Sequence, residues 1–261
     1  MANPAEQWAL HSAQQDMLQA EVEQQPLIGP LEVGFEGLRG KLSGAAPGFL
    51  NGLKAIEKRG YKGMRTVRGD GNCFFRGFMF RLIEKLVVEK NEGERKRLAQ
   101  FMKDSLDILV SAQYELIGVE TFQELMVELF EDDIPRMSTT EDVVNLFSNK
   151  GESEHIVWYS RILCAAYLKL NADRFLPFLS EQYLTMEDFC SREVEPQGKE
   201  CEQLQIIALS EILQISVSIE YLSSASTEES EPVVLGPESA AMMIHFIYRP
   251  GHYDVLYFKD S

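Results

Sequence analysis

The chain has 261 residues, of which 45% are hydrophobic and 25% charged, so it can form one large domain or two small ones around a sizeable core. Its 25 basic and 41 acidic residues give a formal net charge of −16, and a field of that sign repels phosphate backbones. We therefore expect no nucleic-acid partner, and since no run of about 18 apolar residues occurs, we expect no membrane partner either.

The N-terminal sequence indicates the cellular location of the protein, and the spacing of its cysteines indicates whether a metal site or disulfides are expected. Residues 1–6 lack the basic and apolar regions of a secretory signal peptide, so we expect a protein of the cytoplasm and also of the nucleus. The cysteines are Cys73, Cys164, Cys190 and Cys201. No two of them have Cys-x-x-Cys spacing, so we expect neither a metal site nor a disulfide framework.

The first sixty residues differ from the rest. Apolar residues recur at helical spacing at Leu10, Ala13, Met17 and Ala20. This pattern predicts a weakly amphipathic helix in an N-terminal arm over residues 1–24, either a docking helix for a partner or a frayed terminal helix. Glycines and prolines are dense over residues 26–48, which predicts an irregular or extended segment.

Periodicity predicts helices first and strands last. The expected helices cover residues 73–89, 95–113, 121–131, 154–170, 185–189 and 203–213. The expected strands cover residues 215–221, 242–248 and 253–258. The Ser- and Glu-rich stretch over residues 223–238 predicts a solvated loop, and Pro250-Gly251 predicts a hairpin between the last two strands.

Cys73 stands where a turn becomes a helix. Asp70-Gly71-Asn72 is typical of a tight turn, and the residues after Cys73 have the composition of a largely buried helix. A thiol is a poor nucleophile until it loses its proton at a pKa of about 8.5, and a helix N-terminus or a nearby imidazolium lowers that pKa. The free backbone N–H groups of the same turn can bind an oxyanion.

A matching base is expected at His252. It follows the Pro-Gly turn at a strand start, and residues two apart on a strand point to the same side, so His252 and Asp254 can be neighbours. Asp254 can then orient the imidazole, as in a catalytic triad. By contrast, His245 lies within an apolar strand and is predicted to be a core residue, as is Cys164 within a helix.

These residues alone leave two interpretations open. A cysteine before a helix and a His-x-Asp pair are each more often structural than catalytic, and their combination makes the two interpretations equally good. Cys190 and Cys201 are predicted to be structural.

Three longer segments carry a family resemblance. Residues 68–76, Arg-Gly-Asp-Gly-Asn-Cys-Phe-Phe-Arg, resemble the nucleophile motif of the OTU cysteine deubiquitinases, specifically the otubains. Residues 248–254, Tyr-Arg-Pro-Gly-His-Tyr-Asp, resemble their histidine motif, and residues 189–209 resemble a stretch between the two. Phe75 and Gly77 stand where the family often has Tyr and Ala.

The resemblance implies an α+β, papain-like OTU fold, in which a large helical region flanks a central mixed β-sheet. It implies an arm over residues 1–24 and an OTU catalytic domain over residues 25–261. It implies no cofactor and a monomer that hydrolyses the isopeptide bond after the C-terminal glycine of ubiquitin, in single ubiquitin or polyubiquitin chains.

The resemblance also implies the site residues. Cys73 corresponds to the nucleophile, His252 to the general base and Asp254 to its orienting partner. Asp70 and Gly71 belong to the loop whose backbone N–H groups, with that of Cys73, form the oxyanion hole.

Two alternatives accompany this expectation. Some otubains restrain ubiquitin-conjugating enzymes without cleaving anything, and they use residues ahead of the catalytic domain to do so. A hydrolase for a ubiquitin-like modifier would show the same motifs. The acidic balance suits the basic Arg-Leu-Arg-Gly-Gly tail of ubiquitin, but it does not identify which acidic residues contact that tail.

Overall fold

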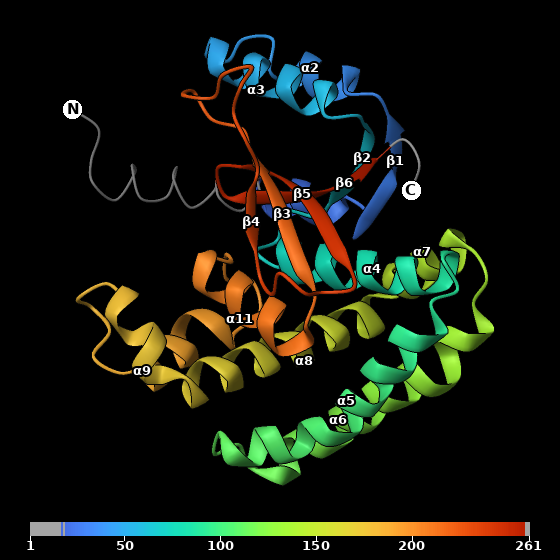
Figure 1. Ribbon diagram of the computed structural model, residues 1–261, viewed down its shortest axis with the longest axis vertical. Helices are drawn as coiled ribbons and strands as arrows, with labels where there is room; N and C mark the ends of the chain where they lie inside the picture. The colour runs from blue at the N-terminus through green and yellow to red at the C-terminus, as the bar shows by residue number, and fades with distance from the viewer. Residues whose placement is uncertain (1–16, 18, 259–261) are drawn as a thin grey trace.

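The computed structural model describes residues 17 and 19–258 and centres them on a six-stranded sheet of order β1-β2-β6-β5-β3-β4 (Figure 1). The strands are β1 (Ile28–Val33), β2 (Tyr61–Val67), β3 (Ser216–Tyr221), β4 (Val233–Leu235), β5 (Met243–Arg249) and β6 (His252–Phe258). The β3 and β5 strands run parallel, whereas the other neighbours pair antiparallel. The expected mixed sheet and the α+β class are therefore confirmed.

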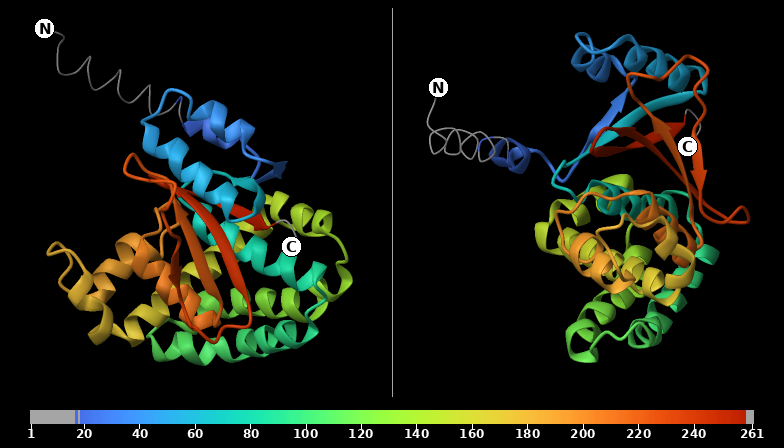
Figure 2. Two further views of the ribbon diagram at one scale, coloured as in Figure 1. Left: turned by 45° about the horizontal axis from the view of Figure 1, so that its top comes forward. Right: turned by 90° about the vertical axis from the view of Figure 1, so that its left-hand side faces the viewer.

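A large helical region lies on one side of the sheet (Figure 2). It contains α4 (Cys73–Val88), α5 (Glu92–Ser111), α6 (Leu116–Glu128), α7 (Thr140–Ser148), α8 (Lys150–Leu170), α9 (Ala172–Phe175), α10 (Met186–Phe189) and α11 (Gln203–Leu213). The predicted helices are all present, the one over residues 203–213 with the predicted ends and the others with shifted ends, whereas α7 and α9 were not predicted. Helix α7 has nine residues and begins with a capping box between Thr139 and Asp142. A helix this short contains too few turns for its apolar periodicity to be clear in the sequence.

Helix α4 packs closest to the sheet and carries Cys73 at its first position. The helix is buried along almost its whole length, as its composition predicts. A Cβ atom at Gly77 would lie 3.0 Å from the Phe246 ring and 3.2 Å from Val255, so the glycine permits this close approach. The contact fixes the start of α4 relative to β5 and β6.

The other side of the sheet is covered by α2 (Glu36–Lys41) and α3 (Pro47–Lys58) (Figures 1 and 2). A second hydrophobic core fills the space between these helices and the sheet. Its buried members are Phe35, Leu38, Leu42, Leu53, Ile56, Tyr61, Met64, Leu222, Ile247 and Leu256. The sheet is thus buried on both faces.

The prediction of an irregular segment over residues 26–48 is wrong. This stretch forms β1, α2 and the start of α3. Its glycines allow close contacts between segments and do not interrupt the secondary structure. A Cβ atom at Gly29 would lie 2.2 Å from Thr66 Oγ1, and one at Gly48 would lie 2.1 Å from the Ser224 carbonyl oxygen. Only the tertiary contacts reveal that role, because glycine density in sequence signals turns equally well.

The stretch over residues 223–238 is only partly a loop. It contains the edge strand β4, and Glu228 anchors it to α3 through ion pairs with Lys54 and Lys58, at 2.8 Å and 3.0 Å. The predicted solvated loop is therefore corrected to an anchored loop followed by a short strand.

Only part of the predicted N-terminal helix lies within the described residues. Residues 19–24 are helical, and Met17 and Ala20 are exposed, whereas Leu10 and Ala13 lie outside the described residues. Over the described part of the chain, none of the helices combines the length and the apolar character that a membrane span needs.

Candidate active site

The Cys73 loop, residues 69–72, connects β2 to α4. Its geometry depends on Gly71, which has φ 77°, a left-handed conformation that glycine adopts without strain. Asp70 Oδ1 accepts hydrogen bonds from the Asn72 backbone N–H at 3.0 Å and from Arg76 Nη1 at 2.8 Å. The turn predicted from sequence is therefore present, and it places the 4%-exposed Cys73 on the first turn of α4.

Three backbone N–H groups at this turn lack an acceptor. Within the described part of the chain, the N–H groups of Asp70, Gly71 and Cys73 donate no hydrogen bond. They stand at the N-terminus of a sixteen-residue helix, where the helix dipole favours negative charge. The turn therefore has unused donors for an anion beside the thiol.

His252 begins β6 across from the Cys73 loop. Its Nε2 lies 2.8 Å from Asp254 Oδ1, which confirms the neighbours expected from strand alternation. Because an ionised carboxylate only accepts, Nε2 carries a proton and Nδ1 is free to take one from the thiol. Nδ1 faces the Cys73 loop, since a Cβ atom at Gly69 would lie 3.4 Å from it.

The imidazole of His252 binds a proton more readily than a free imidazole does. Burial disfavours the imidazolium, but the hydrogen bonds to Asp254 and Cys73 and the negative charge of both partners outweigh it and raise its pKa to about 9. The Cys73 thiol therefore borders the imidazole, which is hydrogen-bonded to the carboxylate.

Asp254 is fully buried and has three donors. Oδ1 accepts from the Val67 backbone N–H at 2.9 Å as well as from His252, and Oδ2 accepts from Arg249 Nη2 at 2.6 Å. Burial would raise the pKa of this carboxyl, but His252 and then Arg249 and Val67 hold it below its ordinary value. Asp254 therefore stays ionised and fixes the ring of His252. No sequence pattern indicated that Arg249 pairs with Asp254.

With this geometry established, comparison with known proteins identifies the family. The family model for Peptidase C65 Otubain matches residues 20–258. The chain belongs to the otubain family. Ubiquitin thioesterase OTUB1 of Homo sapiens is 32% identical over 247 residues, covering 94% of this chain and 88% of that protein. Ubiquitin thioesterase OTUB2 of Homo sapiens is 32% identical over 214 residues, covering 80% and 86%.

Solved structures agree with this family. The structure of h/ceOTUB1, ubiquitin aldehyde and UBC13~Ub has a TM-score of 0.85 and 28% identity, and the match covers 97% of this chain and 98% of the matched chain. A related structure with UBCH5B~Ub also has a TM-score of 0.85, with 29% identity. As an otubain, the chain is a cysteine-type deubiquitinase.

The remaining histidines and cysteines of this otubain that the structure describes have structural roles. His245 bonds Tyr61 Oη at 3.1 Å, and burial, with smaller effects of nearby basic side chains, lowers its pKa to about 4. Cys164, Cys190 and Cys201 are buried free thiols, and burial raises the pKa of each one. No group of three or more His, Cys, Asp or Glu side chains in the described ranges could hold a metal ion.

A second segment packs against the Cys73 loop. This facing segment, residues 194–200, donates the Gly198 N–H to Asn72 Oδ1 at 2.9 Å. A Cβ atom at Gly71 would lie 2.1 Å from the Gly198 oxygen, and one at Gly251 would lie 3.2 Å from Glu200 Oε1. The facing segment thus borders the site and reaches the turn before His252.

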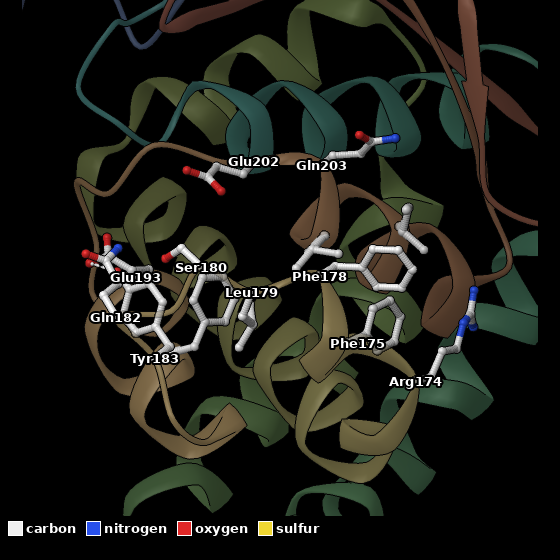
Figure 3. Close-up of a pocket in the computed structure, with 13 residues that line it drawn as sticks. Arg174, Phe175, Phe178, Leu179, Ser180, Gln182, Tyr183, Glu193, Glu202 and Gln203 are labelled. Carbon is white, nitrogen blue, oxygen red and sulfur yellow. Dashed lines mark hydrogen bonds between the residues drawn. The ribbon is translucent and has the colours of Figure 1, made fainter.

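A hollow of about 910 Å³, lined by both aromatic and polar side chains, opens where the facing segment continues into α11 (Figure 3). Glu202 and Gln203 lie along one rim, and the rings of Phe175, Phe178 and Tyr183 lie across the hollow (Figure 3). Phe178 is 73% exposed, which is unusual for a large aromatic side chain. No sequence pattern indicated this hollow, because the residues that line it come from several separate short segments.

Proposed function

We propose that this otubain hydrolyses the isopeptide bond between the C-terminal glycine of ubiquitin and a substrate lysine, with Cys73, His252 and Asp254 as its triad. One observation carries the proposal: His252, hydrogen-bonded to Asp254, lies beside Cys73 at a turn with unused backbone donors. This arrangement combines a nucleophile, a base and an oxyanion site.

The geometry supports a two-step reaction. His252 takes the thiol proton, and the Cys73 thiolate attacks the carbonyl carbon, so that the carbonyl electron pair moves to the oxygen. The N–H groups of Asp70, Gly71 and Cys73 stabilise that oxyanion. The intermediate then collapses, the lysine amine leaves with the proton of His252, and water hydrolyses the thioester in a second cycle.

Ubiquitin is the proposed substrate because the matched OTUB1 structures contain ubiquitin aldehyde, and their matched chain aligns over almost its whole length. The net charge of −16 favours the basic tail of ubiquitin. Glu200 has its carboxylate beside Gly251 at the edge of the site, and it has no ion-pair partner within the described residues. It is therefore available to an arginine of that tail.

The hollow beside the facing segment is the proposed docking place for the body of ubiquitin. It adjoins the facing segment, so a ubiquitin held there could extend its tail toward Cys73. We expect Phe178→Ala to raise KM for ubiquitin carrying a C-terminal fluorogenic amide about tenfold, because an exposed aromatic anchor typically contributes that much binding energy. Steady-state kinetics would measure this change, with kcat nearly unaffected.

Val33 provides a matched control for that variant. It is also exposed, at 78%, but it lies on β1, away from the hollow. Val33→Ala should leave KM unchanged. An equal rise in KM for both variants, or none for Phe178→Ala, would place ubiquitin elsewhere.

The raised pKa of His252 predicts a pH limit. The ordinary pKa of His252 is 6.5 and its folded pKa is about 9, so the imidazolium persists to about pH 9. We expect kcat/KM to fall as pH rises through about 9, and the stability that His252 contributes, complete below pH 6.5, to be lost over the same rise. Activity and thermal denaturation between pH 6 and 10 would test both trends.

The direct test is an intact-mass measurement after mixing the protein with ubiquitin that carries a C-terminal electrophile. A single adduct that is absent in Cys73→Ala would support the nucleophile and ubiquitin recognition together. If the folded protein forms no adduct with ubiquitin but forms one with a ubiquitin-like modifier, the substrate assignment is wrong.

Regulation of ubiquitin-conjugating enzymes is a second candidate function, because UBC13~Ub and UBCH5B~Ub accompany OTUB1 in the matched structures. The Arg68 side chain donates to the Gln25 carbonyl at 2.7 Å, and its backbone N–H donates to the Leu27 carbonyl at 3.1 Å. A protein lacking residues 1–24 would keep both bonds. We expect it to cleave within about twofold of the intact protein and to lose inhibition of a conjugating enzyme.

Parallel cleavage and ubiquitin-transfer assays on the two proteins would measure these effects. Equal inhibition by the truncated protein would exclude the arm as the inhibitory element. A large loss of cleavage would instead show that the arm belongs to the active site.

A further inference from the structure

Arg161 of α8 lies fully buried behind the Cys73 loop and binds four oxygen atoms. Nη2 donates to the Gly71 carbonyl at 2.8 Å and to the Lys199 carbonyl at 2.6 Å. Nη2 and Nε reach Asn72 Oδ1 at 2.9 Å and 3.2 Å, and Nη1 donates to the Val194 carbonyl at 3.0 Å. One side chain therefore joins the Cys73 loop to the facing segment.

The acceptors of Arg161 are all neutral. Within the described residues it forms no ion pair, whereas the other arginine at this loop, Arg76, pairs with Asp70. A buried guanidinium without a carboxylate partner is costly, and its burial lowers the pKa of Arg161. A methionine would fill similar space without that cost, so two features need the guanidinium: its hydrogen bonds to the loop and its position over the Phe75 ring, 4.4 Å from the ring centroid.

These bonds constrain the peptide that follows Gly71. Gly71 has a left-handed φ of 77°, and glycine permits the following peptide to flip at low cost. A flip would remove the Gly71 carbonyl from Arg161 and the Asn72 N–H from Asp70. The peptides on either side, which carry the unused N–H groups of Gly71 and Cys73, would then lose the bonds that hold the turn between them. Arg161 therefore favours the arrangement in which those donors stay available.

We propose that Arg161 is a positioning residue for the oxyanion site: it holds Gly71 and Asn72 so that the N–H groups of Asp70, Gly71 and Cys73 can bind the oxyanion. This inference rests on the proposed function, because it assigns a role within that reaction. Arg161 touches no reacting atom and acts through the loop.

The test compares a reaction that forms an oxyanion with one that does not. Hydrolysis of ubiquitin carrying a C-terminal fluorogenic amide forms it, whereas displacement of bromide from ubiquitin bearing a C-terminal bromoethylamide forms a thioether without it. We expect Arg161→Met to lower kcat of hydrolysis about 10²-fold, with KM nearly unchanged, as for the loss of an oxyanion donor. The alkylation rate should fall much less.

If Arg161→Met does not fold, Asn72→Leu is a second variant for the same comparison of hydrolysis with alkylation. It removes the acceptor that Arg161 shares with the Gly198 N–H and should give the same selective loss of hydrolysis. Arg81→Met is the matched control, since Arg81 is also a buried arginine but pairs with Glu84 at 2.8 Å within α4. Its ratio of hydrolysis to alkylation should equal that of the wild type.

The outcomes separate the two proposals. Equal losses of hydrolysis and alkylation in folded Arg161→Met and Asn72→Leu would show a general structural role, and unchanged hydrolysis would show no role. Either result overturns the assignment of Arg161 while leaving the proposed function intact. If the wild type carries out neither reaction, the proposed function fails and the assignment falls with it.

Discussion

Cys73→Ala is expected to lower cleavage of isopeptide-linked di-ubiquitin by at least about 10⁴-fold, because the reaction loses its only accessible route to a thioester. The other thiols cannot replace it. The thiols of Cys164, Cys190 and Cys201 each donate to a backbone carbonyl, of Gln205, Ala165 and Glu202 respectively, and burial raises the pKa of all three. Quantifying the mono-ubiquitin product over time would measure the loss.

The fold and ubiquitin binding should survive this substitution. Cys73 is a small residue on the first turn of α4, and removing its sulfur atom leaves only a small cavity. Cys201→Ala is the matched control, since it also removes a buried thiol near the site, and it should cleave at the wild-type rate. Clear turnover by Cys73→Ala, or its loss in Cys201→Ala, would identify a different nucleophile.

Asp254→Asn is expected to lower kcat about 10²–10⁴-fold, since it removes the negative charge that orients His252 and raises its pKa. The amide cannot satisfy all three donors around it. If its oxygen faces His252, its NH₂ group meets Arg249, and if it turns over, its NH₂ group meets His252. Either orientation leaves a buried donor opposite another donor.

The same substitution should lower thermal stability, because Asp254 is fully buried and the charge of Arg249 loses its partner. Arg249→Met separates the two effects, since it removes one donor but leaves the contact between His252 and Asp254. We expect it to lower stability with a smaller loss of kcat than Asp254→Asn. A rate unaffected by Asp254→Asn would show that another residue orients the histidine.

The pH profile offers an independent check of the same pair. In Asp254→Asn, the upper limit of activity should move below the wild-type value of about 9, because the hydrogen bond and charge that raise the pKa of His252 are gone. An upper limit that stays in place would assign it to a group other than His252.

Local patterns predicted the parts of the site that depend on local geometry. The turn at Gly71 and the start of α4 follow from residues next to one another, and so do the hairpin at Pro250-Gly251 and the shared side of His252 and Asp254. Backbone preferences and strand alternation act over two to four residues, so one sequence suffices to detect them.

Contacts between distant segments were not predictable in this way. The glycine density over residues 26–48 predicts an irregular segment, although Gly29 and Gly48 lie at close contacts with Thr66 and Ser224. Glycine has the same sequence signature in a turn and at a tight contact, and only the partner segment distinguishes the two.

The residue pattern alone specifies the chemical groups of this otubain: a thiol at a helix start, a base and its carboxylate two residues apart, and a turn that leaves N–H groups free. The electrostatic state of these groups depends on the folded arrangement. The pKa of His252 depends on Cys73, 179 positions earlier, and the shape of the Cys73 loop depends on Arg161, 90 positions after Gly71. Charge interactions and hydrogen bonds depend on distance and burial, which arise only once the chain has folded.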